Sequence, residues 1–130
     1  PSLLSMFSAS RCSIVLVLHS NHPNELSSKV ANACQNLRNS GISLLNQSVL
    51  LKDINDDPQT LAKLSEKLFS LGVLPYDLHQ LDKAQGTGHF EVDDEKAIDL
   101  HEFLKTNLPG YLVPKLVREQ SGAAYKLNLY

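Results

Sequence analysis

The chain has 130 residues, enough for one hydrophobic core, and we expect a single domain over residues 1–130. Its 12 Lys and Arg residues stand against 14 Asp and Glu residues, a net charge of −2, and the charges are scattered along the sequence. This composition argues against the basic surface of proteins that bind nucleic acid or anionic membranes. The longest apolar run, residues 14–18, is far shorter than the roughly 20 residues of a membrane-spanning helix, so we expect a soluble protein.

The two cysteines, Cys12 and Cys34, lie far apart in the sequence. Their spacing fits neither a zinc site nor the disulfide framework of a small secreted domain. We expect both to be reduced thiols buried as small hydrophobic residues, which favours a cytoplasmic protein. The chain starts at Pro1 and continues with an irregular Ser-rich segment, from which we expect it to be part of a longer protein.

The pattern of apolar residues predicts strands that alternate with helices. Residues 13–18 form a short, continuous run rich in β-branched side chains, as in a strand buried on both faces. Asn24 is the expected cap of a helix whose apolar residues recur at helical spacing and which ends at Gly41. Residues 42–51 are the second expected strand.

The next segment repeats this alternation. Asp56-Asp57-Pro58 predicts the start of a helix, because an acidic cap precedes proline at the first helical position, and Gly72 predicts its end. Residues 73–79 form the third expected strand. A polar loop then runs from Asp82 to His89, and loops of this length usually carry function.

Asp93 or Asp94 is the expected cap of a third helix, and Pro109-Gly110 ends it before a fourth strand at residues 111–117. The order β-α-β-α-β-α-β predicts an α/β fold with parallel strands joined by right-handed crossovers. An open doubly wound sheet and an arc of a (β/α) barrel both fit this order. Four strands cannot close a barrel, which usually has about eight.

Polar residues follow the first, third and fourth expected strands and lie within the second, and parallel α/β proteins gather their reactive groups at the carboxyl ends of their strands. They are His19, His22, Asn46, Gln47, Ser48, His79, Asp82, Lys83, Arg118, Glu119 and Lys126. The sequence has no glycine fingerprint after the first strand, no Walker loop and no nucleophile-elbow serine, which argues against the common nucleotide-binding and hydrolase motifs.

Each candidate also has an ordinary structural interpretation. His19 and His22, three residues apart, fit a shared metal, although histidines in irregular loops more often form local hydrogen bonds. Gln47 can simply satisfy neighbouring backbone groups. Asp82 and the lysine after it can form a solvated pair of little energetic value. Lys126 is either a solvated lysine or, once deprotonated, an amine that bonds to an aldehyde cofactor.

A series of short motifs covers nearly the whole chain. They are HSNHPNE (residues 19–25), LNQSVLL (45–51), ND (55–56), LPY (74–76), LH (78–79), LDK (81–83), QG (85–86), HF (89–90) and GYLVPKLVRE (110–119). In this order they resemble the lysine 2,3-aminomutase family of radical S-adenosylmethionine enzymes, especially the branch that makes β-lysine for elongation factor P. The resemblance implies the C-terminal half of such an enzyme, with the later strands of a partial (β/α), TIM-like barrel.

The resemblance also implies an activity and its cofactors. The family converts L-α-lysine into β-lysine by a radical 1,2-amino shift, an isomerase reaction that uses S-adenosylmethionine, a [4Fe-4S] cluster and pyridoxal phosphate. Three cysteines in a C-x-x-x-C-x-x-C motif hold the cluster, and this chain lacks them, so we expect no metal ligands and no activity from the chain alone. The implied partners are L-lysine and the elongation factor P pathway, with its lysyl-transferring enzyme; a homo-oligomer remains open.

Five residues receive roles from the resemblance. His19 and Gln47 match positions that contact S-adenosylmethionine. Asp82 and Glu119 match two carboxylates that pair with the ε-ammonium group of the substrate, and such charge-assisted bonds would measure the length of the lysine side chain. Lys126 matches the lysine that binds pyridoxal phosphate.

The sequence departs from the family pattern at several positions. Ala123-Ala124-Tyr125 precede the lysine of the expected cofactor loop and tail, residues 118–130, where the family usually has more glycine or Gly-Glu-Pro-Ser. Asp77 replaces a usual tyrosine, and Gln80 stands where an apolar residue is common. The alternative hypothesis is a non-catalytic fragment or degenerate relative that serves as an α/β folding or interaction unit.

Overall fold

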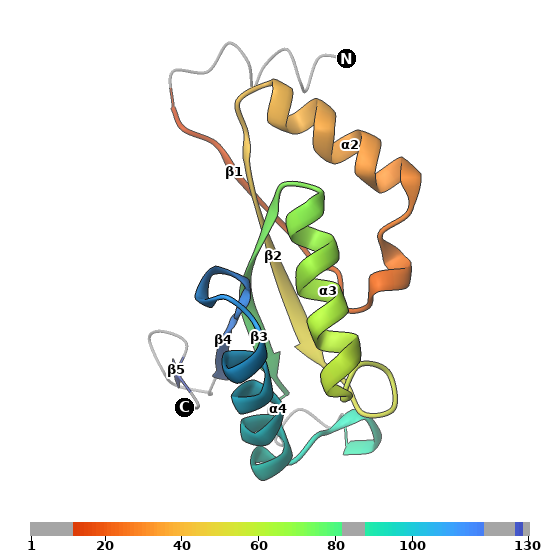
Figure 1. Ribbon diagram of the computed structural model, residues 1–130, viewed down its shortest axis with the longest axis vertical. Helices are drawn as coiled ribbons and strands as arrows, with labels where there is room; N and C mark the ends of the chain where they lie inside the picture. The colour runs from red at the N-terminus through yellow and green to blue at the C-terminus, as the bar shows by residue number, and fades with distance from the viewer. Residues whose placement is uncertain (1–11, 82–87, 119–126, 129–130) are drawn as a thin grey trace.

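The computed structural model describes residues 12–81, 88–118 and 127–128 of the chain (Figure 1). Strands alternate with helices along it, as predicted from the sequence. The elements are β1 (Val15–Leu18), η1 (Pro23–Glu25), α2 (Ser28–Asn39), β2 (Ser43–Leu50), α3 (Pro58–Ser70), β3 (Val73–Gln80), η3 (Gly88–Phe90), α4 (Asp94–Asn107), η4 (Gly110–Leu112), β4 (Lys115–Arg118) and β5 (Leu127–Asn128), where η marks a 3₁₀ helix.

The strands form one sheet in the order β1-β2-β3-β4-β5. The first four strands are parallel, and β5 is antiparallel to β4. The prediction of four parallel strands is confirmed, whereas β5 is a short addition that the sequence pattern did not predict. Each parallel strand pairs with the next one in the chain, so that α2, α3 and α4 each advance the chain by one strand.

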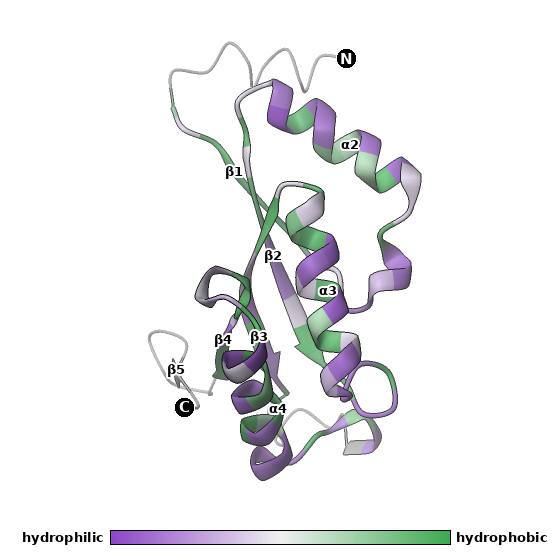
Figure 2. Cartoon of the chain, viewed as in Figure 1, coloured by the Kyte–Doolittle hydropathy of each residue, from purple (hydrophilic) through white to green (hydrophobic). Residues whose placement is uncertain are grey.

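Two apolar clusters fill the space between the sheet and the helices. One joins α3 and α4 to β2, β3 and β4 through Leu50, Leu61, Ala62, Leu78, Val92, Ala97, Leu100, Leu104 and Leu116. The other joins α2 and α3 to β2 and β3 through Leu26, Cys34, Ile42, Leu44, Leu64, Leu68 and Val73. Figure 2 shows the resulting alternation of apolar and polar bands along α3 and α4.

Both clusters lie on the same face of the sheet, since Leu44 and Leu50 of β2 are an even number of residues apart and point the same way. Helices on a single face, with strands in sequential order, are typical of a (β/α) barrel; a doubly wound sheet has helices on both faces. The structure therefore decides between the two predicted arrangements in favour of the barrel arc.

The ends of the helices follow the predicted signals in most places. Asp57 caps α3 by accepting a hydrogen bond from the Thr60 N–H at 3.0 Å. Asp93 caps α4 by accepting from the Lys96 N–H at 2.9 Å. Gly72 follows α3 with a φ of +79°, a left-handed conformation that favours glycine.

Two boundaries differ from the predictions. The first long helix begins at Ser28 with Ser27 as its cap, because Asn24 is taken up in the separate 3₁₀ helix η1 that starts at Pro23. The fourth strand begins at Lys115 instead of residue 111, because residues 110–112 form the 3₁₀ helix η4.

The prediction that the first strand is buried on both faces is wrong for β1. Val15 and Val17 are 52% and 40% exposed, whereas the intervening Leu16 packs against the second apolar cluster. The reason is the one-sided placement of the helices, which cover only one face of this strand. Cys12 is likewise exposed while Cys34 is buried, and neither of these two described cysteines is in a disulfide. No helix in the described ranges is long and apolar enough to cross a membrane.

Candidate functional site

An asparagine of β2 fixes the chain just beyond β1. The Ser20 N–H donates to Asn46 Oδ1 at 2.9 Å, and Asn46 Nδ2 donates back to the Ser20 carbonyl oxygen at 3.0 Å. Asn46 is 1% exposed, so this pair of bonds satisfies a buried amide and a buried backbone unit together. The backbone on either side of Ser20, including His19, is thereby held against β2.

Two further asparagines extend this link to the end of β2. Asn21 Oδ1 accepts from the Val49 N–H at 2.9 Å. Asn55, which is fully buried, donates from Nδ2 to the carbonyl oxygens of Asn21 and Val49, each at 2.8 Å, and accepts from the Leu51 N–H at 2.8 Å. We call Asn21, Asn46 and Asn55 the asparagine network. It joins the loop after β1 to the end of β2 as one hydrogen-bonded unit.

Sequence reasoning named Asn46 only as part of a polar rim and gave Asn21 and Asn55 no role. The available signal was an amide in an otherwise apolar strand, which must find partners when buried. Which backbone groups would be those partners depends on how two strands and a loop are placed in space, and no local pattern records that placement.

The structure brings the two expected S-adenosylmethionine contacts to adjacent strands. Leu18 of β1 pairs with Asn46 of β2. His19 directly follows Leu18 and Gln47 directly follows Asn46, so the two residues lie next to the same pair. His19 is exposed and borders a small hollow of about 180 Å³, and Gln47 is partly exposed on the face away from the helices. Both side chains are therefore accessible, His19 just past the carboxyl end of β1 and Gln47 within β2 beside that end.

His22 has a local structural role. Its Nδ1 accepts a hydrogen bond from the Asn24 N–H at 3.1 Å and so caps η1. The described residues contain no group of three or more His, Cys, Asp and Glu side chains arranged to hold a metal ion. The structure thus shows a local hydrogen bond of His22, one of the two interpretations that the sequence allowed.

A β-bulge in β3 determines which polar side chains share a face with Gln47. Asn46 pairs with Pro75 and Gln47 with Asp77, so Tyr76 is an extra residue in β3. Beyond the bulge, Asp77 and His79 share the face of Gln47, away from the helices. Asp77 Oδ2 lies 3.8 Å from His79 Nε2, and both residues are buried. Sequence reasoning listed His79 among the rim residues but did not predict this pair.

The remaining expected site residues, Asp82, Glu119 and Lys126, lie outside the described residues, as does most of the segment 118–130. Their roles remain predictions. Described residues near them are tied to α4 and to the segment just before it: Gln80 donates to the Val92 carbonyl oxygen, and Arg118 forms an ion pair with Asp94 of α4.

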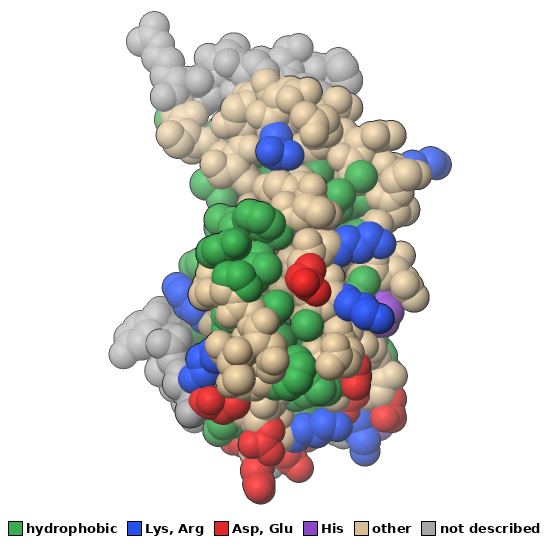
Figure 3. Space-filling model, viewed as in Figure 1, with side chains coloured by type: hydrophobic (Ala, Val, Ile, Leu, Met, Phe, Trp, Pro, Cys, Tyr) green, Lys and Arg blue, Asp and Glu red, His purple; other side chains and the backbone are tan. Residues whose placement is uncertain are grey.

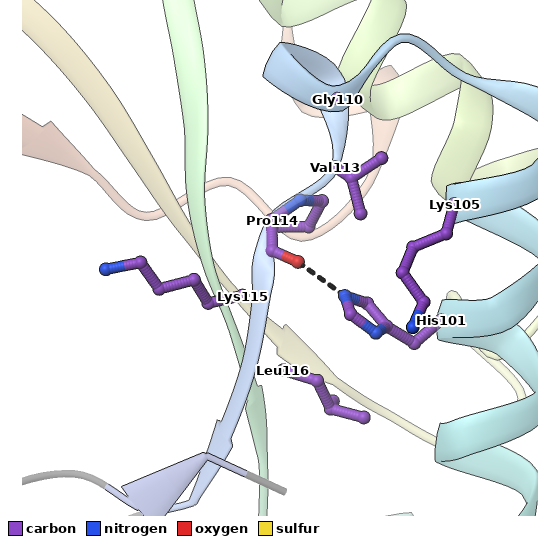
Figure 4. A pocket seen from close by; sticks show the side chains of 7 residues that line it. All are labelled: His101, Lys105, Gly110, Val113, Pro114, Lys115 and Leu116. Atoms are coloured by element: carbon purple, nitrogen blue, oxygen red, sulfur yellow. Dashed lines mark hydrogen bonds between the residues drawn. The ribbon is translucent and has the colours of Figure 1, made fainter. Parts of the chain in front are cut away.

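A hollow of about 480 Å³ lies on the helix side of the sheet, lined by residues of α4, η4 and β4 (Figure 4). Within it, His101 Nε2 is 2.8 Å from the Pro114 carbonyl oxygen. Burial lowers the pKa of His101, which favours the neutral imidazole. Figure 4 shows Lys115 extending away from α4, so the hollow and the face of Gln47 are on opposite sides of the sheet.

The cysteines do not fit an iron–sulfur cluster. Cys34 points into the second apolar cluster, and burial raises the pKa of its thiol, which disfavours the thiolate that iron requires. Cys12 lies exposed before β1. Any cluster of the intact protein would have to be held by residues from outside this chain.

Relatives with known names share this sequence over most of its length. The L-lysine 2,3-aminomutase of Escherichia coli (strain K12) is 50% identical over 128 residues, which is 98% of this chain and 37% of that protein. The L-lysine 2,3-aminomutase of Haemophilus influenzae is 48% identical over 94% of this chain and 36% of its own length. The resemblance to the lysine 2,3-aminomutase family is confirmed. The chain spans little more than a third of these relatives, and a scan against family models gave no match.

A solved structure supports the same fold. A radical SAM methyltransferase from Sphaerobacter thermophilus superposes with a TM-score of 0.61 over 92% of this chain and 38% of its own, at 13% sequence identity. At this identity the likeness shows the fold alone. The arc of parallel strands is thus shared with part of a radical SAM enzyme, as predicted.

Proposed function

We propose that this chain is part of an L-lysine 2,3-aminomutase, an isomerase that converts L-α-lysine into β-lysine by a radical 1,2-amino shift. The observation that carries the proposal is the 50% identity to an L-lysine 2,3-aminomutase over 98% of the chain. The asparagine network adds physical support, since it binds together three of the motifs on which the resemblance rests. Those motifs contain His19 and Gln47, the expected contacts to S-adenosylmethionine.

Five residues of this chain would take part in binding the cofactors and the substrate. His19 and Gln47 bind S-adenosylmethionine beside the carboxyl end of β1, held in place through Asn46. Asp82 and Glu119 pair with the ε-ammonium group of lysine, and Lys126 carries pyridoxal phosphate. When bound, the cofactors supply a radical and a conjugated system that stabilises it while the amino group moves.

The branch of the family and the location of the enzyme are also part of the proposal. The motifs favour the branch whose β-lysine is passed by a lysyl-transferring enzyme to elongation factor P. The cytoplasm suits this role and keeps cysteines outside disulfides, such as Cys12 and Cys34, reduced. L-lysine is the proposed substrate, and whether the enzyme forms a homo-oligomer is decided by measuring its mass in solution.

A non-catalytic fragment is the second candidate, and one observation favours it. The 130 residues contain two cysteines, too few for a C-x-x-x-C-x-x-C motif. The two candidates are separated by the sequence that precedes Pro1 in the reading frame. A cysteine motif there supports the enzyme, and an anaerobic assay of the intact protein with lysine and all three cofactors should yield β-lysine. Failure to form β-lysine with the cluster intact would refute the enzymatic proposal.

The assignment of Lys126 has a test of its own in the intact protein. Pyridoxal phosphate bound through this amine should give a visible absorption band, and reduction with borohydride should fix the cofactor to the peptide that contains Lys126. Lys126→Ala should lose the adduct, because a methyl group has no amine. Lys115→Ala is the matched control and should keep it. A label on Lys83 or Lys115 would show that the assignment of the loop is wrong.

A further inference from the structure

Asn21, two residues after His19, is held at three points. Its N–H donates to Glu25 Oε1 of η1 at 3.0 Å. Its side-chain Oδ1 accepts from the Val49 N–H of β2 at 2.9 Å, and its carbonyl oxygen accepts from Asn55 Nδ2 at 2.8 Å. The last two partners lie 28 and 34 residues away in the sequence. The position of Asn21 is therefore fixed both within its own loop and against the neighbouring strand.

The amides of two asparagines take the place of a strand where β2 runs on past the end of β1. Ser43 of β2 donates its N–H to the carbonyl oxygen of Ile14, just before β1. Val49 lies an even number of residues after Ser43, so its backbone groups face the same side. There the Val49 N–H bonds to Asn21, and the Val49 carbonyl oxygen accepts from Asn55 at 2.8 Å. The side chains thus continue the pairing that the end of β1 interrupts.

The attachments of the loop lie on both sides of one proposed contact to S-adenosylmethionine and next to the other. On β2 the loop is attached at Asn46 and Val49, and Gln47 lies between these two residues. On the loop, the attached residues are the two that directly follow His19. A shift of the loop along β2 would therefore change the distance between His19 and Gln47.

We propose that Asn21 is a positioning residue for the binding of S-adenosylmethionine, which acts by fixing His19 relative to Gln47. The inference rests on the proposed function, which makes His19 and Gln47 contacts of that cofactor. A side chain binds a ligand well only when its supporting groups hold it within about 0.5 Å of the productive geometry. The hydrogen bonds described above join Asn21 to protein groups, so its effect on the cofactor passes through His19.

Two substitutions separate the bond to Val49 from the bulk of the Asn21 side chain. Asn21→Leu keeps a similar volume but cannot accept from the Val49 N–H, whereas Asn21→Asp keeps an oxygen that can. Calorimetry on the intact, cofactor-loaded protein measures the affinity for S-adenosylmethionine. Asn21→Leu should weaken it about tenfold, the lower end of the losses that follow removal of groups that orient metal ligands. Asn21→Asp should retain most of the affinity.

The coupling between Asn21 and His19 distinguishes positioning from a purely structural role. His19→Ala removes the contact that Asn21 is proposed to position. In this background Asn21→Leu should change the affinity by less than about twofold, because the effects of residues that act through one another are not additive. Asn39→Leu is the matched control. It removes a hydrogen bond from Gln35 on the exposed surface of α2 and should leave the affinity unchanged in both backgrounds.

The outcomes separate this inference from the proposed function. Wild-type protein that does not bind S-adenosylmethionine, or a His19→Ala variant that binds it as tightly as the wild type, overturns the proposed contacts and this inference together. If His19→Ala binds more weakly but Asn21→Leu binds normally, the inference alone is overturned.

Two further results would also overturn the role of Asn21 alone. One is a loss in Asn21→Leu that persists undiminished in the His19→Ala background, because Asn21 would then act through overall stability or through another group. The other is an Asn21→Asp variant that binds as weakly as Asn21→Leu. If Asn21→Leu fails to fold, Asn21→Ala removes the same acceptor with less bulk and takes its place in both backgrounds.

Discussion

Two regions of the molecule are held together by different chemistry. The loop after β1 is joined to β2 by the neutral amides of the asparagine network, which are buried or partly buried. The surroundings of α4 depend on ionisable groups: Lys96 pairs with Asp56 at 2.9 Å, Arg118 pairs with Asp94, and His101 contacts Pro114. Figure 3 shows acidic side chains gathered at the end of the molecule where α4 begins.

This difference predicts how the two regions respond to solution conditions. Hydrogen bonds of neutral amide groups keep their strength when pH or salt changes. Ion pairs at the surface weaken because salt screens them. The stability of the region that positions His19 and Gln47 should thus change less with pH and salt. The stability of the region around α4 should change more. Three substitutions sharpen the comparison, beginning with the largest expected effect.

Asn55→Asp should destabilise the fold most. The isosteric carboxylate keeps an acceptor for the Leu51 N–H but loses both donations, and it places a charge against the carbonyl oxygens of Asn21 and Val49. An uncompensated charge of this kind costs about 3–5 kcal/mol of unfolding free energy. Urea unfolding measures the loss. Asn21→Asp is the matched control, because the Asn21 side chain accepts from Val49 and should change stability by less than about 1 kcal/mol.

His101→Gln should have a smaller effect that depends on pH. Burial lowers the pKa of His101 in the folded protein, so the unfolded chain binds protons more readily as the solution is acidified. The wild type should therefore be at full stability above the ordinary value of 6.5 and lose stability as the pH falls below it. At pH 8 the glutamine variant should lose about 1 kcal/mol with the bond to Pro114.

The measurement for His101 is urea unfolding at several pH values between 8 and about 5, a span chosen around the ordinary histidine pKa. The stability of His101→Gln should fall less than that of the wild type across this span. Equal slopes for the two proteins would assign the acid sensitivity to another group. His22→Gln, at the exposed turn of η1, provides a comparison outside the α4 region.

Lys96→Met should have the smallest effect. Burial raises the pKa of Asp56, but the hydrogen bond from Lys96 and two from backbone groups outweigh it, and the pKa is lowered. This carboxylate therefore stabilises the fold above its unfolded value of 3.8 and loses that contribution as pH falls through the lower folded value. At neutral pH the melting temperature should drop slightly, and the drop should shrink in high salt. A drop that salt leaves unchanged would contradict an ion-pair origin.

Much of the fold followed from local patterns. The leucines of α3, its Asp57-Pro58 start and the glycine after it predicted that helix well, because propensity, cap and apolar face all agree there. The Asn24 cap failed because two adjacent polar segments competed to start a helix, and Ser27 provides the cap. The exposure of Val15 and Val17 was missed because a run of β-branched residues does not say how many faces of the sheet are covered.

The site was less predictable than the fold. His19 and Gln47 could be named from motifs, and strand order alone was enough to bring them to neighbouring strands. The sequence did not predict the hydrogen bonds of Asn21 and Asn55 or the proximity of Asp77 to His79. These contacts depend on how the strands pair and where the loop after β1 lies, and local sequence patterns do not record either. The alternation of a strand predicts faces only while no residue is inserted, and β3 contains such an insertion at Tyr76.

The bulge allows β3 to contain one residue more than β2 while the residues beyond it keep their faces. If the bulge were straightened with Tyr76 kept in the strand, strict alternation from Pro75 would turn Asp77 and His79 toward Leu50 and the helices, and it would turn Leu78 and Gln80 to the opposite face. Straightening the bulge would thus exchange the surroundings of four side chains at once, burying a carboxylate in the apolar core and withdrawing a leucine from it. Deleting Tyr76 would instead leave Asp77 opposite Gln47 in an unbroken ladder, so we expect that deletion to keep these faces and to remove only the ring that contacts Lys115.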